Sequence, residues 1–124
     1  MSGYSDVKAV TITADTVALD ADGISVAASV GNNAALTIGG ALASGGAVAL
    51  SHGRIVTILS AGNDSSKSFT VVGTDVNGDS QTESITGANA GTATGTKYFK
   101  TIASITAVGN PAGNVSAGVN ASAA

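Results

Sequence analysis

Short runs in which apolar and polar residues alternate recur along this chain, and Gly, Asn and Asp separate them. Alternation with a period of two is typical of a β-strand with one buried face, whereas the helical period of 3.6 residues is hard to find here. The clearest runs are at residues 7–13, 54–60, 98–108 and 115–119, and weaker ones are at 24–30, 35–38 and 47–50. The pattern therefore predicts an all-β protein.

The run at residues 54–60 (RIVTILS) is apolar on both of its faces. Successive side chains of a strand point to opposite sides, so Val56 and Ile58 share one face while Ile55 and Leu59 share the other. Strands that are covered on both faces lie inside a sheet rather than at its edge. We therefore expect this strand to be central.

Residues 67–86 predict a β-hairpin. Asn77-Gly78 lies between two alternating runs, and this dipeptide tolerates positive φ at both central positions of a turn. A two-residue type I′ turn requires that backbone conformation. We therefore expect a type I′ hairpin, with Phe69 and Val71 on the same face.

The segments between the runs predict bends and loops. Ser, His and Gly at residues 51–53 predict a bend between two strands, residues 88–95 a flexible loop, and residues 109–114 a turn around the only proline. Carboxyl groups at residues 20–23 and 75–79 are interpreted as belonging to solvated turns.

The predicted fold class is a single antiparallel β-sandwich or small β-barrel domain of roughly seven to nine short strands. Residues 23–119 are expected to form this domain. Residues 1–22 are expected to form an N-terminal arm or first strand, and residues 120–124 a frayed tail.

The composition predicts a thin hydrophobic core. Val, Ile, Leu and Phe together make up 28 of the 124 residues, and Trp is absent. A core of this kind is marginal at this chain length, and small cores are commonly supported by oligomerisation. We therefore expect the chain to associate with itself, as a homotrimer or dimer, or to dock onto a larger surface.

Charge and cysteine content exclude several classes of partner. Five Lys and Arg against eight Asp and Glu give a net charge of -3, which is unsuited to nucleic acid. Without cysteine there is no disulfide and no Cys-ligated zinc. No charged residue lies between Asp22 and Arg54, but two Gly-Gly pairs interrupt the apolar stretch 34–50, which is shorter than a membrane span. Two short strands around a glycine-rich turn fit it better, so no membrane partner is expected.

No catalytic, cofactor-binding or metal site is predicted. His52 is the only histidine, and we interpret it as a surface residue of the predicted bend. The oxygen-rich turns at residues 20–23 and 75–79 do not match an EF-hand loop. Glu83 is the only glutamate, so a pair of catalytic carboxylates would need aspartates in turns. We expect the protein not to be an enzyme.

Several blocks in the second half of the chain follow one another in a recognisable order. They are SAGND at 60–64, FTV and GTD within 69–75, TGANAGT at 86–92, and KYFKT at 97–101 leading into Ser104-Ile105. In this succession, residues 54–118 resemble small virion structural proteins of tailed bacteriophages.

The resemblance implies a capsid decoration (cement) protein, made in the cytoplasm of the bacterial host and bound to the outer surface of the phage head. Its partner would be the major capsid protein, whose lattice it would stabilise by bridging adjacent subunits, and the N-terminal arm would reach a neighbouring subunit. Two alternatives remain open. One is a phage tail or fibre component, and the other is a carbohydrate- or calcium-binding β-sandwich module, although stacking on sugars needs exposed aromatic rings and this chain has few.

Overall fold

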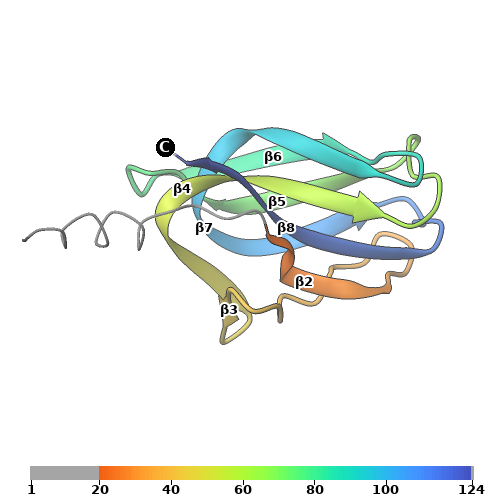
Figure 1. The fold of residues 1–124 in the computed structure, drawn as a ribbon, viewed down its shortest axis with the longest axis horizontal. Coiled ribbons are helices and arrows are strands. Elements are labelled where there is room, and N and C mark those ends of the chain that lie inside the picture. The colour runs from red at the N-terminus through yellow and green to blue at the C-terminus, as the bar shows by residue number, and fades with distance from the viewer. Residues whose placement is uncertain (1–19, 124) are drawn as a thin grey trace, which may run out of the picture.

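The chain forms an all-β domain, as the alternating pattern predicts. The computed structural model describes residues 20–123. Seven strands lie in one antiparallel sheet, with no helix among the described residues (Figure 1). The strands are β2 (Asp20–Ser29), β3 (Ala43–Ser44), β4 (Ala47–Ser60), β5 (Ser68–Thr74), β6 (Ser80–Thr86), β7 (Thr92–Val108) and β8 (Asn114–Ala123).

The sheet has the order β2-β8-β4-β7-β5-β6, and the short β3 pairs with β4. Strand β7 pairs along its first half with β4 and along its second half with β5, so it connects two parts of the sheet. Ile24 of β2 and Phe69 of β5 are far apart in the strand order, yet both belong to one buried cluster. The sheet therefore curls around a single core, with β6 in the upper part and β2 in the lower part of Figure 1.

The predicted central strand lies where the pattern indicates. Residues 54–60 are the second half of β4, which is hydrogen-bonded to β7 on one side and to β8 on the other. Val56 and Ile58 are fully buried, whereas Leu59 on the opposite face is 38% exposed. The prediction of a central position is thus confirmed, but only one face is completely covered.

The two predicted strands at 47–50 and 54–60 are one strand. Between the pairs Ala49↔Thr101 and Arg54↔Phe99, residues 50–53 of β4 oppose Lys100 alone, which makes a large bulge. A bulge bends its strand because the extra residues have no ladder partners. The bend predicted at residues 51–53 is therefore present, but it lies within a continuous β4.

The predicted hairpin is confirmed as β5 and β6, and its turn differs from the prediction. Gly78 N donates to Asp75 O, and Asp75 N donates to Asp79 O. The Asp75 carboxylate also accepts hydrogen bonds from Asn77 N and Asp79 N, at 2.8 and 3.0 Å. Gly78 has φ +86°, whereas Asn77 does not have positive φ. The connection is therefore a type I turn followed by a glycine bulge, because the Asp75 side chain stabilises that form.

Three other boundaries differ from the predictions. Residues 92–95, predicted as a loop, begin β7, and β8 continues to Ala123, beyond the predicted end at residue 119. Residues 35–38 make only an isolated bridge, between Ala35 and Thr106. The predicted strand at 7–13 and most of the predicted arm lie outside the described residues.

Candidate functional site

Charged side chains are distributed unevenly over the fold. Residues 23–53 and 101–123 contain no Asp, Glu, Lys or Arg. Among the described residues, the charged side chains fall at positions 20 and 22 and between positions 54 and 100. Both stretches can be seen in the sequence, but the sequence does not show where they lie relative to each other in the fold.

The fold brings the two uncharged stretches together. Leu36 N donates to Ile105 O at 2.8 Å, and Ala107 N donates to Ala34 O at 2.9 Å. Strand β2 pairs along its length with β8, which belongs to the second stretch. Val48 of β4 pairs with Ile102 of β7. We call the exposed parts of residues 23–53 and 101–123 the uncharged surface.

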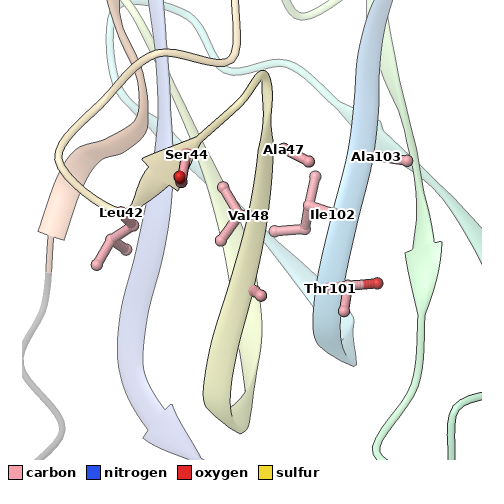
Figure 2. A pocket seen from close by; sticks show the side chains of 8 residues that line it. Leu42, Ser44, Ala47, Val48, Thr101, Ile102 and Ala103 are labelled. Atoms are coloured by element: carbon pink, nitrogen blue, oxygen red, sulfur yellow. The ribbon is translucent and has the colours of Figure 1, made fainter.

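Two open cavities lie on the uncharged surface. Figure 2 shows the first, a groove of about 290 Å³ between the β3–β4 hairpin and β7. Its lining residues are Leu42, Ser44, Ala47, Val48, Ala49, Thr101, Ile102 and Ala103. The second cavity has about 340 Å³ and lies beside β2, where Val26 is 55% exposed. Both are lined by small or apolar side chains, so they suit apolar contact rather than chemistry on a charged ligand.

Arg54 and Asp20 lie at the margin of the uncharged surface. The Arg54 guanidinium donates from Nε and Nη2 to Asn120 O, at 3.3 and 3.0 Å. Partial burial lowers the pKa of Arg54 from its usual value, and the nearby Asp20 carboxylate raises it. This margin holds the end of β8 against the bulged part of β4.

His52 is exposed in the bulge of β4. Among residues 20–123, no hydrogen bond to its side chain is formed. A catalytic histidine is normally oriented by an acidic or carbonyl partner and lies within reach of a nucleophile. The structure places His52 at the surface, and it brings no such partner to it from the described part of the chain.

Residues 20–23, predicted as a turn, belong to strand β2, and two of the four aspartates at 20–23 and 75–79 have contacts in the fold. One oxygen of Asp75 accepts two backbone N–H groups of its own turn. Asp20 lies near Arg54 and beside the backbone of Gly23. Within residues 20–123, no three His, Cys, Asp or Glu side chains are grouped closely enough to hold a metal ion.

Glu83, which the sequence analysis considered only as one member of a catalytic carboxylate pair, is buried in the structure. It is 7% exposed, and its Oε2 accepts from Thr96 N at 2.6 Å and from Thr96 Oγ1 at 3.1 Å. Lys97 N donates to its other oxygen at 3.4 Å. Strand β6 is thereby linked to the first half of β7, with which it shares no ladder. The hydrogen bonds to the Glu83 carboxylate connect β6 with this part of β7, where the two strands have no backbone ladder.

Asp64 is the second buried carboxylate that sequence reasoning missed. It is fully buried, and its Oδ1 accepts from Ala112 N at 2.7 Å, while Oδ2 has no partner. Asp64 N donates to Ala88 O, so this residue joins three loops at one end of the sheet. Its position in a polar turn gave no signal of burial, because the covering loops are distant in sequence.

Residues 20–123 contain no helix that is long and apolar enough to cross a membrane. Comparison with known proteins gives no relative: no family model, no curated protein and no solved structure matches this chain. Among the described residues, the uncharged surface with its two apolar cavities is the feature that bears most directly on function.

Proposed function

We propose that this chain is a non-enzymatic structural protein of a tailed-phage virion, most specifically a capsid decoration protein on the outer surface of the head. Its role is mechanical. Each copy adds buried interface between adjacent major capsid subunits, and anything that binds the assembled lattice more tightly than the separated subunits stabilises the lattice.

The uncharged surface is the observation that supports this proposal most directly. The buried centres of protein–protein interfaces are depleted of charged residues relative to other protein surface. Here two long uncharged stretches meet on one part of the molecule, around open apolar cavities. Val26 and Val108 are 55% and 50% exposed there, and burying such side chains against a partner is favourable.

The blocks behind the resemblance have a structural role that is compatible with this proposal. Residues 60–64 and 86–92 form two of the three loops joined at Asp64, where Ala90 N donates to Gly62 O at 2.8 Å. An alanine Cβ at Gly62 would lie 1.9 Å from Ala112 O, so this packing requires glycine. These two blocks therefore contribute to closing one end of the domain.

A sugar-binding role has less support. Phe69 and Phe99 are fully buried, so the prediction that Phe69 belongs to the core is confirmed. Tyr98 is then the one aromatic ring with partial exposure among residues 20–123. Sugar sites use exposed aromatic rings for stacking, and a single half-buried ring is a poor platform.

The test is the location and copy number of this chain in purified particles of the phage that encodes it. Quantitative protein gels give the ratio of this chain to the major capsid protein, and antibody labelling in the electron microscope gives its position. We expect hundreds of copies on the head. A few copies at the tail would replace the proposal with a tail or fibre role, and absence from the particle would refute a virion role altogether.

A further inference from the structure

The tip of the β5–β6 hairpin contains the one Asn-Gly step of the chain. Asn77 is followed by Gly78, whereas each of the other seven asparagines is followed by a residue with a side chain. A backbone nitrogen can attack the side-chain carbonyl carbon of the asparagine before it, and a Cβ atom on the attacking residue hinders this approach. Glycine has no Cβ atom. The nitrogen that follows Asn77 is therefore the least hindered one for this reaction.

The structure leaves the Asn77 side chain accessible. Asn77 and Gly78 are both exposed, and among residues 20–123 no hydrogen bond to the Asn77 side chain is formed. A Cβ atom added at Gly78 would meet no other atom within 4 Å, so there is open space beside the attacking nitrogen. Solvent therefore reaches the side-chain amide, and no partner holds the amide in one orientation.

Two other asparagines are held by their side chains. Asn63 Oδ1 accepts from Ser65 N at 3.1 Å and from Ser65 Oγ at 2.7 Å. Asn33 Oδ1 accepts from Gly109 N at 2.9 Å, so its amide joins two segments that are distant in sequence. These bonds oppose the reorientation of the amide that an attack requires. Sequence and structure together therefore favour Asn77 as the reactive asparagine.

We propose that Asn77 is a site of spontaneous modification, at which the side-chain amide is lost. In the first step the Gly78 nitrogen attacks Asn77 Cγ. The N–Cγ bond forms, the Cγ–Nδ2 bond breaks, and Nδ2 leaves as ammonia with the proton that the Gly78 nitrogen gives up. The product is a succinimide ring. In the second step water adds to one of the two ring carbonyl carbons and breaks its bond to nitrogen. Opening at Cγ gives aspartate, and opening at the main-chain carbon gives isoaspartate.

The turn that holds Gly78 limits how often this attack occurs. Gly78 N donates to Asp75 O at 3.0 Å, and the Asp75 carboxylate accepts from Asn77 N and Asp79 N. The Gly78 nitrogen has to leave its hydrogen bond before it can attack, so the tip has to open first. Asp75 stabilises the closed turn and thereby slows the conversion, although it does not itself react.

The modification gives the hairpin tip a second chemical state. Either product carries a carboxylate between Asp75 and Asp79, and it changes the net charge of the chain from -3 to -4. Like charges that are close together repel each other. Isoaspartate also lengthens the main chain of the turn, because the backbone then passes through the side-chain carbon. The tip of a converted molecule therefore differs in charge and shape from the tip of a newly made one.

The experiment follows the purified, folded chain during incubation at neutral pH. Digestion with trypsin releases residues 68–97, which contain Asn77, as one peptide. Loss of the amide raises the mass of this peptide by about 1 Da. Fragmentation by electron transfer locates the change and distinguishes isoaspartate from aspartate. Asn89 lies in the same peptide, is exposed and is followed by alanine, so it serves as an internal control.

We expect Asn77 to lose its amide before Asn89 and before the other asparagines of the folded chain, with isoaspartate among the products. The inference is overturned if Asn89 converts first. It is also overturned if Asn77 in the folded chain keeps its amide over the time in which the same chain, unfolded in urea, loses it. The measurement uses the isolated chain, so its result is independent of whether the protein is found on a phage head.

Two variants test whether the turn limits the rate. Asp75→Ala removes the carboxylate that accepts two backbone N–H groups. Asp79→Ala is the matched control, because it removes the same charge beside Asn77 from a side chain that forms no hydrogen bond within residues 20–123. Circular dichroism verifies that both variants are folded. Since a hydrogen bond to a charged group is lost only in Asp75→Ala, we expect conversion there to be at least about tenfold faster than in Asp79→Ala. Equal rates would refute the restraining role of the turn.

Discussion

The link between β6 and β7 gives a prediction whose size can be worked out from the structure. Thr96 donates to the Glu83 carboxylate from its backbone nitrogen at 2.6 Å and from its hydroxyl at 3.1 Å. Hydrogen bonds to a charged group each contribute about 1.5–3 kcal/mol, and the bond from Lys97 N at 3.4 Å is too long to add much. Thr96 is exposed, so water replaces part of the hydrogen bonding that Thr96 loses when the Glu83 carboxylate is removed. We therefore expect Glu83→Ala to lower the free energy of unfolding by about 2–3 kcal/mol.

Gly95 allows this explanation to be tested through a double-mutant cycle. A Cβ atom at Gly95 would lie 2.6 Å from Glu83 Oε1, and its three nearest neighbours all belong to the Glu83 carboxyl group. Gly95→Ala alone must therefore displace the carboxylate, at a cost of about 1–3 kcal/mol. In a chain that already carries Glu83→Ala, all three of these nearest atoms are absent. There we expect Gly95→Ala to be neutral or to stabilise by up to about 1 kcal/mol, because Gly95 does not have positive φ.

Urea denaturation followed by circular dichroism, at one fixed protein concentration, gives the four free energies of the cycle. We expect a coupling energy of at least about 1 kcal/mol between the two sites. Ser84→Ala is the control for substitution in β6, because its side chain is exposed, and it should change stability by less than about 0.5 kcal/mol. If Gly95→Ala costs the same with and without Glu83, the carboxylate is not the link between these strands.

Five further substitutions, two of them controls, test the core, the hairpin turn and the contact between β5 and β7. The denaturation assay serves for the first two tests and soluble expression for the third. Phe69→Ala removes a fully buried ring and should lower the free energy of unfolding by about 3–5 kcal/mol. Val72 lies on the opposite face and is 38% exposed, so Val72→Ala should lower it by less than about 1 kcal/mol. Equal losses would contradict the assigned faces of β5. Gly78→Ala forces positive φ on alanine and should lower the free energy of unfolding by about 1–2 kcal/mol. Asn77 does not have positive φ, so Asn77→Ala should lower it clearly less. The reverse order would contradict the glycine-bulge turn. Gly73→Ala would place a Cβ atom 1.9 Å from a backbone oxygen of β7. We therefore expect no folded protein in the soluble fraction after expression, and a stable, soluble variant would show that β5 and β7 are not this close.

The amino-acid sequence by itself determined the local features of this protein. Alternation with a period of two indicated the all-β class, the central position of residues 54–60 and the shared face of Phe69 and Val71, because the two faces of a strand see different surroundings. Asn77-Gly78 indicated the β5–β6 hairpin because few dipeptides accept the backbone angles of a tight turn. These features depend on residues within a few positions of one another.

The tertiary structure alone decided which strands are neighbours and which polar groups are buried. Alternation assigns a side chain to a face and says nothing about the adjacent strand, so the order β2-β8-β4-β7-β5-β6 was not predictable. Glu83 and Asp64 are buried by partners 13 and 48 residues away, and nothing in their local sequence indicates that such partners exist. The meeting of the two uncharged stretches has the same origin, since it depends on hydrogen bonds such as that from Leu36 N to Ile105 O, which join distant parts of the chain.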